Sequence, residues 1–315
     1  MSRTDHATEQ RPPTGSRAVA IGGGHGLARA LGALPSVVEQ VTAVVTVADD
    51  GGSSGRLRRD LDILPLGDLR MALTALAPGA LLADLVAYRF RKGELAGHSL
   101  GNLILVALQE LSDGDVVRAL DHLARLLEIP GRVLPCTTDH VSLHAATAGG
   151  AVTGQAAVAA TPRLERVWLE PSDPRGHPQV VGAIERADLI VLGPGSLYTS
   201  LLPNLLVPDV ARAVVRATVP VVLVANLREQ PGETEGMGLI DHLDALHRHV
   251  PGIGIDVLIL HEGPAPRGSG APLTGTDADL APWVGRTLRA DLLDGRDGHA
   301  PQVLADLLKE VLVHP

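Results

Sequence analysis

One stretch decides the fold: Ala18-Val19-Ala20-Ile21-Gly22-Gly23-Gly24-His25-Gly26, an apolar run that ends in a glycine-rich turn. A second apolar run, from Val41 to Val47, ends in Ala48-Asp49-Asp50-Gly51-Gly52-Ser53-Ser54-Gly55-Arg56. Uninterrupted apolar runs are typical of strands that are covered on both faces. Glycine lets backbone N–H groups come close to a ligand, and a helix that begins after such a turn favours anions. We therefore expect both turns at one sheet edge, where they suit a phosphorylated ligand.

Strands and helices alternate regularly in the later part of the chain. From residue 179 onward the alternation predicts an α/β fold with a doubly wound, mainly parallel sheet. Region 57–128 is mostly helical by its pattern and is expected to be an insertion near the ligand edge. Residues 1–16 are expected to form a disordered tail, 17–315 a single domain, and the chain past 263 to be irregular up to a last helix at 301–313. Between these regions we expect strands at 132–134, 142–147, 167–169, 189–192, 221–225 and 256–260, and helices at 179–187, 208–217 and 239–249.

Composition excludes several classes of protein. Apolar residues make up 45% of the chain and aromatic residues only 2%, so the core must consist of Leu, Val, Ala and Ile. The formal net charge of −9 argues against a nucleic-acid partner, which needs a basic face. The sequence contains neither a secretory signal nor an apolar run near the ~18 residues of a membrane span, so a cytoplasmic protein without membrane association is expected. The single cysteine, Cys136, cannot form an internal disulfide.

Four unusual sequences each follow a predicted strand, at 22–26, 49–56, 193–200 and 226–234. Ligands of parallel sheets bind beyond the carboxyl ends of the strands, so this shared placement predicts one composite site. The first turn departs from the G-x-G-x-x-G pattern, because its third glycine comes early, and a tight turn without ligand is the alternative. No Walker A lysine follows it.

The second turn offers charged groups for the ligand. Two adjacent acids point in different directions, so only one of Asp49 and Asp50 is expected to face the site. We favour Asp50, for a metal ion such as Mg²⁺ or for a ligand hydroxyl. Among the three nearby arginines we favour Arg56 for a phosphate, because it is closest to the turn.

The stretch Gly97-His98-Ser99-Leu100-Gly101 matches the G-x-S-x-G nucleophile elbow of α/β-hydrolases. That mechanism needs a strand that runs into the serine, whereas a charged, glycine-containing segment precedes it here. The preferred interpretation is that this stretch begins a helix, which presents backbone N–H groups and Asn102 to the site. A second anion-binding candidate is Gly193-Pro194-Gly195-Ser196-Leu197-Tyr198-Thr199-Ser200, which is dense in donors and is followed by Asn204.

Five motifs occur together and in order. This set resembles the YvcK family of gluconeogenesis factors, also called the CofD-like family, over residues 17–260. The motifs are Gly22-Gly23-Gly24-His25-Gly26, the stretch from Thr46 to Arg58, Gly67-Asp68-Leu69-Arg70, Gly97-His98-Ser99-Leu100-Gly101-Asn102 and the stretch from Gly193 to Ser200. Gln230-Pro231-Gly232-Glu233-Thr234 and Asp241-His242 fit the same family. Leu66 and Met71 depart from it, since the family usually has a proline and an asparagine there.

The resemblance implies a Rossmann-like fold, a cytoplasmic protein and a role in cell shape and cell-wall synthesis during gluconeogenic growth. It also implies binding of UDP-sugars such as UDP-N-acetylglucosamine. The related CofD enzymes transfer a 2-phospho-lactyl group with Mg²⁺, so two classes remain open: a regulator that binds a UDP-sugar or another nucleotide, and a CofD-like transferase. A third interpretation, a dinucleotide-binding oxidoreductase, is supported by the first glycine turn alone. The sequence leaves open whether the chain forms a homo-oligomer. The residues expected to bind the ligand are Gly23, Gly24, His25, Asp49, Asp50, Ser53, Ser54, Arg56, Asn102, Gly195, Ser196, Thr199 and Asn204, with Asp50 as the metal ligand.

Overall fold

The computed structural model describes residues 12–295 and 298–314 of the chain. The first eleven residues of the expected tail lie outside this part. The last residues of that tail do make contacts, because the backbone N–H of Gln40 donates to the Ser16 carbonyl oxygen (3.0 Å) and that of Glu39 donates to Ser16 Oγ (3.1 Å). Ser16 is therefore attached to the start of the second strand.

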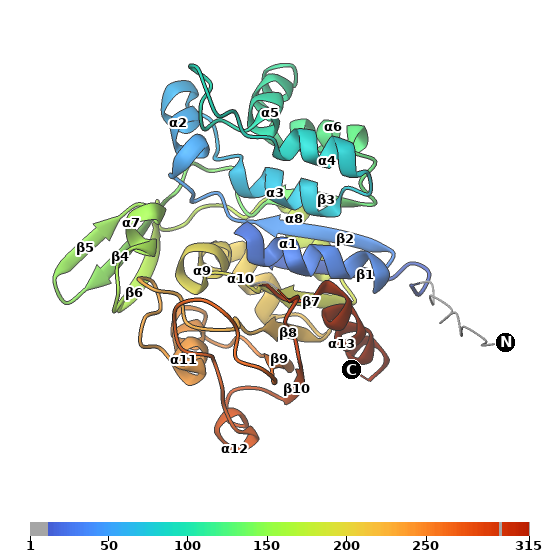
Figure 1. Cartoon of the computed structure of the whole chain (residues 1–315), viewed down its shortest axis with the longest axis vertical. Coiled ribbons are helices and arrows are strands. Elements are labelled where there is room, and N and C mark those ends of the chain that lie inside the picture. The colour runs from blue at the N-terminus through green and yellow to red at the C-terminus, as the bar shows by residue number, and fades with distance from the viewer. Residues whose placement is uncertain (1–11, 296–297, 315) are drawn as a thin grey trace.

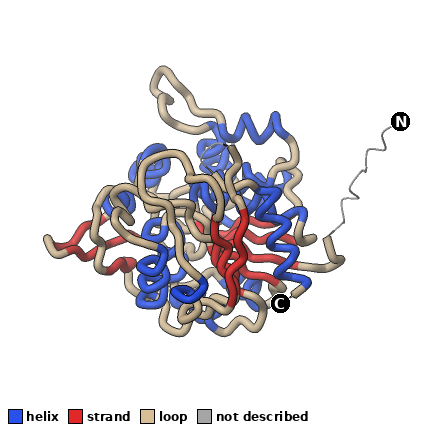
Figure 2. The backbone as a smooth tube through the Cα atoms, turned by 60° about the horizontal axis from the view of Figure 1, so that its bottom comes forward, coloured by secondary structure: helices blue, strands red, loops and turns tan. Residues whose placement is uncertain are grey.

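A central sheet of seven parallel strands organises the described chain, in the order β10-β9-β8-β7-β1-β2-β3 (Figures 1 and 2). The strand β1 lies inside the sheet, with Ala20 opposite Ala43 of β2 on one side and Val191 of β7 on the other. This arrangement confirms the expected doubly wound α/β fold. The strands are β1 (Arg17–Gly22), β2 (Gln40–Val45), β3 (Gly131–Pro135), β7 (Leu189–Leu192), β8 (Val221–Val224), β9 (Val257–His261) and β10 (Arg286–Ala290).

Helices cover both faces of this sheet. The helices α1, α3 and α13 pack against one another on one face, while α8 and α10 pack together on the other, as right-handed crossovers in opposite directions require. The larger helices are α1 (Gly24–Ala33), α2 (Gly52–Leu61), α3 (Gly67–Leu76), α4 (Ala80–Ala87), α5 (Leu100–Glu110), α6 (Val116–Leu126), α8 (Pro178–Glu185), α10 (Pro208–Val215), α11 (Leu239–His249) and α13 (Pro301–Val313). Short helices lie at Leu34–Ser36, Leu197–Leu201, α9 (Leu202–Leu205) and α12 (Asp277–Leu280).

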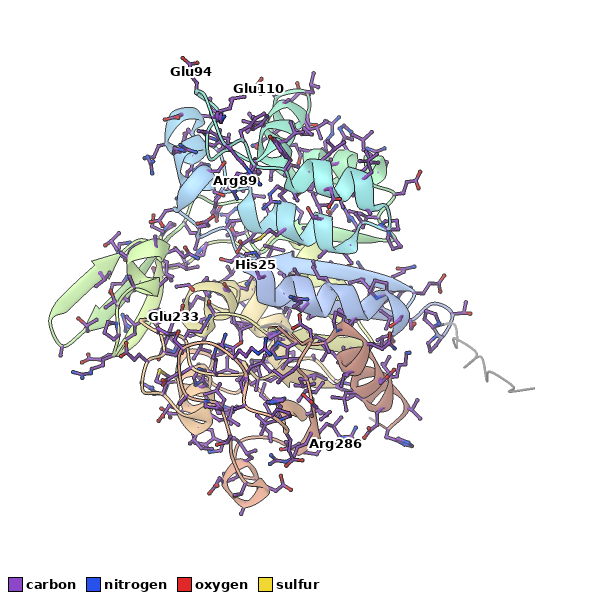
Figure 3. All side chains as sticks on the ribbon, in the orientation of Figure 1. His25, Arg89, Glu94, Glu110, Glu233 and Arg286 are labelled. Carbon is purple, nitrogen blue, oxygen red and sulfur yellow. The ribbon has the colours of Figure 1, made fainter. Side chains whose placement is uncertain are left out.

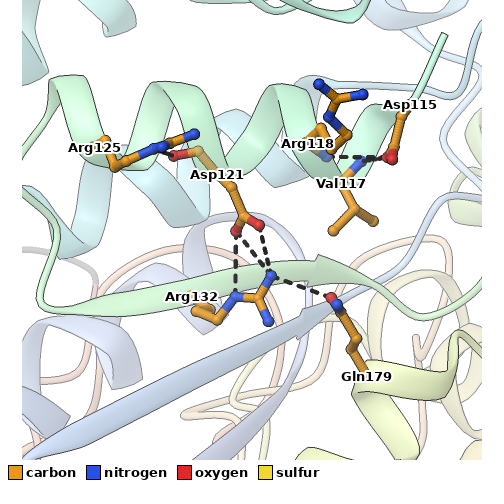
Figure 4. Close-up of polar contacts among 7 residues, drawn as sticks. All are labelled: Asp115, Val117, Arg118, Asp121, Arg125, Arg132 and Gln179. Atoms are coloured by element: carbon orange, nitrogen blue, oxygen red, sulfur yellow. Dashed lines mark hydrogen bonds and ion pairs between the residues drawn. The ribbon is translucent and has the colours of Figure 1, made fainter. Parts of the chain in front are cut away.

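The expected helical insertion is one enlarged crossover between the neighbouring strands β2 and β3, and it forms the upper part of the molecule in Figure 1. Its last helix is fixed to the sheet by Arg132 of β3, which pairs with Asp121 of α6 (2.7 Å) and donates to Gln179 of α8 (3.1 Å) (Figure 4). The helix α6 begins at Asp115, whose carboxylate accepts the N–H groups of Val117 and Arg118. The crossover thus brings α2, α3 and α5 to the edge of the sheet at which the first glycine turn lies.

A small antiparallel sheet, β5-β4-β6, projects from the domain beside α7 (Figure 1). Its strands are β4 (Ser142–Thr147), β5 (Gly150–Thr153) and β6 (Arg166–Glu170), and α7 spans Gln155–Ala159. Both β5 and α7 are missing from the sequence-based expectation, because they are short and β5 is largely exposed.

The expectation of an irregular chain past residue 263 is wrong for β10 and α12. The strand β10 is the edge strand next to β9, and all five of its residues are half-buried. A strand of this kind has no uninterrupted apolar run by which the sequence could reveal it. No helix in the described part of the chain is long and apolar enough to cross a membrane.

The order of the strands reverses between β1 and β7. From β1 the chain proceeds to β2 and β3 on one side, and later from β7 to β10 on the other. The crevice beyond the carboxyl ends of strands at such a switch point is where doubly wound folds bind ligands.

Candidate functional site

A cleft of about 620 Å³ lies beyond the carboxyl ends of β1, β7 and β8. Its walls come from the glycine turn after β1, the turn after β7 and the segment after β8. Another space, of about 640 Å³, lies beyond β9 and β10 and is lined by neither glycine turn. The residues around the first cleft are Gly23, Gly24, His25, Gly26, Arg29, Asp68, Met71, Gln155, Ala159, Pro194, Gly195, Ser196, Thr199, Ser200, Asn226, Leu227, Arg228, Gln230, Gly298 and His299.

The glycine turn lies directly against the turn after β7. A Cβ atom at Gly26 would be 2.4 Å from the Pro194 carbonyl oxygen and 2.6 Å from Gly195 Cα, so only glycine fits. Gly24 adopts a φ of +62°, in the left-handed region that glycine tolerates. The start of α1 therefore faces 193–196, whereas the sequence analysis paired it with 49–56.

Two buried or half-buried asparagines hold these turns in place. The Asn226 side chain donates to the Gly195 carbonyl oxygen (2.8 Å) and accepts the Gly195 N–H (2.9 Å). The Asn204 amide donates to the carbonyl oxygens of Gly22 (2.9 Å) and Ser200 (2.7 Å). Asn204 is fully buried and does not line the cleft, so this predicted ligand residue instead orients the glycine turn. Asn226 was not among the predicted residues, although the segment that it begins was.

A buried carboxylate organises the turn after β7. Glu233, in the loop between β8 and α11 (Figure 3), accepts the Tyr198 N–H (2.6 Å) and the Thr199 hydroxyl (2.7 Å). Burial raises the pKa of Glu233, and these hydrogen bonds oppose the rise. The hydroxyl of Thr199, a predicted ligand residue, is therefore already engaged. Ser196 Oγ accepts a hydrogen bond from Gln230 (3.0 Å) and lines the cleft.

Two arginines and a histidine add polar groups that sequence reasoning missed. Arg228 lines the cleft, and its Nη1 is buried without a hydrogen-bond partner among the described residues. Arg29, on α1, pairs with Asp294 (2.9 Å). His299 is neutral at pH 7, because burial lowers its pKa to about 4, and its Nε2 bonds the Ala225 carbonyl oxygen (2.9 Å). Nothing in a single sequence singles out Arg228 from the other arginines.

The acid that faces the glycine turn is Asp68, at the start of α3. A Cβ atom at Gly23 would be 2.5 Å from Asp68 Oδ2, and the Gly24 N–H bonds this carboxylate. Burial, then the charge of Asp49, raises the pKa of Asp68 to about 7. Burial also raises the pKa of Asp49, with a smaller contribution from Asp50. Asp68 was not among the residues predicted to bind the ligand.

Asp49 and Asp50 point in different directions, as expected. Asp50 Oδ1 accepts the N–H of Ala156 in α7 (2.9 Å), while Asp49 Oδ1 accepts the N–H of Gly51 (2.9 Å). Neither residue lines the cleft, and Asp49, rather than the favoured Asp50, interacts electrostatically with Asp68. No group of three or more His, Cys, Asp or Glu side chains that could hold a metal ion occurs within 12–295 and 298–314. The assignment of Asp50 to a metal stays a prediction.

The remaining predicted residues lie together outside the cleft. Ser53 accepts a hydrogen bond from Asn102 (3.2 Å), Ser54 bonds Asp49, and Arg56 donates to the Ala96 carbonyl oxygen (3.1 Å). The cleft therefore gathers Gly23, Gly24, His25, Gly195, Ser196 and Thr199, whereas Asp49, Asp50, Ser53, Ser54, Arg56, Asn102 and Asn204 lie around it.

Comparison with known proteins identifies the family. The family model described as "2-phospho-L-lactate transferase CofD" matches residues 18–272. The "Gluconeogenesis factor" of Bacillus subtilis (strain 168) is 43% identical over 250 residues, which cover 78% of this chain and 78% of that protein. The chain belongs to the CofD-like family of gluconeogenesis factors.

Other members of this family differ in length. The "Putative gluconeogenesis factor" of Deinococcus radiodurans is 42% identical over 309 residues, which cover 94% of this chain but 66% of that protein. This chain therefore spans about two thirds of that relative's length. A crystal structure of a UPF0052 family member from Bacillus halodurans superposes with a TM-score of 0.86 at 37% identity, and covers 93% of this chain and 98% of that one. The fold of this CofD-like chain is thus also that of a solved structure.

Proposed function

We propose that this CofD-like gluconeogenesis factor binds a nucleotide sugar, of the UDP-N-acetylglucosamine type, in the cleft at the switch point and does not consume it. It would act in the cytoplasm as a regulator of cell shape and cell-wall synthesis under gluconeogenic growth. The observation that carries the proposal is the meeting of two turns, Gly23–Gly26 and Pro194–Ser196, at the start of α1. Arg228 also lines this cleft, and its Nη1 has no hydrogen-bond partner among the residues that the structure describes.

The diphosphate belongs at the start of α1 in this proposal. The first turn of this ten-residue helix contains no acidic residue of its own, although the Asp68 carboxylate of α3 accepts the Gly24 N–H. Because burial raises the pKa of Asp68 to about 7, this carboxyl only partly offsets the positive end of the helix, which still favours an anionic ligand. Arg228 is the side chain that best suits the diphosphate, because a guanidinium donates two parallel hydrogen bonds to phosphate oxygens. Asp68, on the opposite side of the turn, suits a ribose or sugar hydroxyl as a hydrogen-bond acceptor.

Calorimetry with UDP-N-acetylglucosamine tests this function. Loss of a charge-assisted hydrogen bond costs about 1.5–3 kcal/mol, so Arg228→Gln should weaken binding by roughly ten- to a hundredfold. Arg216→Gln is the matched control, because Arg216 is exposed and lines a cavity at the opposite end of the strands. Absence of binding heat in the wild type, or equal affinity of the two variants, would contradict the proposal.

A CofD-like transferase is the second candidate, and Asp68 favours it. A carboxyl with a pKa of about 7 can both accept and donate a proton at neutral pH, which suits a general acid–base. Asp49 and Asp68 are also the pair of carboxylates that fits Mg²⁺. This ion is commonly held by one or two carboxylates together with substrate phosphates, and it would neutralise charge on those phosphates. Appearance of UDP or UMP after long incubation with the nucleotide sugar and Mg²⁺ would favour turnover, whereas intact nucleotide sugar supports the regulator.

A further inference from the structure

The glycines of Gly97-x-Ser99-x-Gly101 make room for arginine side chains. A Cβ atom at Gly97 would be 2.8 Å from Arg56 Nη2. One at Gly101 would be 2.5 Å from the Val86 carbonyl oxygen and 2.8 Å from Arg70 Cδ. Ser99 itself is fully buried and accepts the N–H of Asn102 (3.2 Å) as the N-cap of α5. The motif therefore brings two arginine side chains close to the start of α5, and its serine serves as a buried helix cap.

Two more basic side chains lie next to this motif. Arg89, from the segment between α4 and α5 (Figure 3), donates to the Gly97 carbonyl oxygen (2.6 Å). His98 Nδ1 lies 3.1 Å from Ser53 Oγ, at the start of α2. We define the cationic cluster as Arg56, Arg70, Arg89 and His98.

Hydrogen bonds connect the cluster to the N-terminal ends of two helices. Arg70 Nε donates to Asn102 Oδ1 (3.1 Å), and Asn102 Nδ2 donates to Ser53 Oγ (3.2 Å). Asn102 lies in the first turn of α5 and Ser53 in the first turn of α2, helices of eleven and ten residues. The positive ends of both helices therefore add to the charge of the cluster.

The arginines of the cluster lack a direct ion pair in the described part of the chain. None of the three arginines has an ion pair within 4.0 Å among the residues that the structure describes. Arg70 is only 6% exposed, and Arg56 Nε is buried without a hydrogen-bond partner in the described chain. Burial and the charge of Arg89 lower the pKa of Arg70, and the charge of Asp68 only partly opposes them. A buried charge without a directly paired counter-charge is costly, so an anion would stabilise this arrangement.

We propose that the cationic cluster is a second anion-binding site, separate from the nucleotide cleft, and that it takes the phosphate of a phosphate monoester. Arg89 is exposed and Arg56 and His98 are half-buried, whereas Arg70 is buried, so an anion from solvent would meet the first three. Three guanidinium groups and two helix ends offer more donors than a carboxylate needs, which favours a phosphate dianion. This proposal does not depend on the nucleotide sugar, because none of the four residues lines the cleft.

Inorganic phosphate, titrated by calorimetry at constant ionic strength, tests the site in the full chain. The wild type should bind phosphate, and Arg56→Gln should bind it at least about tenfold more weakly, as expected for a lost charge-assisted hydrogen bond. Arg59→Gln, which removes an exposed charge from the same helix, should leave phosphate affinity within about twofold, since surface charges contribute little. Both variants should retain the wild-type circular dichroism spectrum and the wild-type affinity for UDP-N-acetylglucosamine.

Three results would overturn the proposal. The first is absence of phosphate binding by the wild type, and the second is an equal loss in Arg56→Gln and Arg59→Gln. The third is competition between phosphate and UDP-N-acetylglucosamine, which would place the anion in the cleft. Failure of the nucleotide sugar to bind would leave the phosphate result intact, so the two proposals fail separately.

Discussion

At the scale of single residues, Asp68 couples the site to pH. Its pKa of about 7 in the folded chain lies well above the ordinary value of 3.8, so between these values the unfolded chain loses a proton that the folded chain retains. Raising the pH through this window therefore destabilises the folded state, by about 1.4 kcal/mol for each unit of pKa difference.

Asp68→Asn removes this effect and preserves an oxygen that accepts the Gly24 N–H. The stability of the variant relative to the wild type, measured as the free energy of unfolding in urea, should increase as the pH rises from about 4 to about 7 and then stay constant. Asp84→Asn, at an exposed carboxylate of α4, serves as the control. A difference between Asp68→Asn and wild type that does not change with pH would contradict the raised pKa.

Residue types alone reveal which polar side chains are near the site, but not which way they face. The sequence analysis expected that one of Asp49 and Asp50 faces inward, and favoured Asp50. The structure instead uses the Asp50 carboxylate to hold the start of α7, a helix too short to be expected. Arg228 and Asn226 lie in a segment that sequence reasoning did single out, yet their roles depend on contacts with chain far away in sequence.

At the scale of elements, the position of α1 depends on one close approach. In Gly26→Ala the new methyl group would overlap Pro194 and Gly195, so the variant should lose about 1–3 kcal/mol of stability. Gly32→Ala, in the same helix, meets only Pro301 carbon atoms at 3.8 Å and should be neutral or stabilising by up to about 1 kcal/mol. Urea denaturation measures both, and equal effects would show that the α1 contact with 193–195 is loose.

The helix α5 provides a test of the hydrolase alternative. Ser99 caps this helix and is fully buried, so a fluorophosphonate probe should not label the native chain, as judged by intact-mass spectrometry. Ser99→Ala should instead lower stability by about 0.5–2 kcal/mol through loss of the cap. Labelling of the wild type that disappears in Ser99→Ala would restore a nucleophilic serine.

At the scale of the whole molecule, strand order decides which turns can share a ligand. Apolar runs and their alternation with helices were sufficient to predict the doubly wound sheet. They could not show that β7 lies beside β1, because strand neighbours are set by packing between distant segments. For this reason the sequence analysis assigned the phosphorylated ligand to the turns after β1 and β2, whereas the cleft in the structure lies between the turns after β1 and β7 and the segment after β8.

A crystal structure of the chain with UDP-N-acetylglucosamine tests the central claim most directly. The account predicts the diphosphate at the N-terminal end of α1, in contact with the backbone of Gly23–Gly26 and of Gly195 and with the guanidinium of Arg228. A diphosphate held instead by the cationic cluster at Arg56, or beyond β9 and β10, would contradict it.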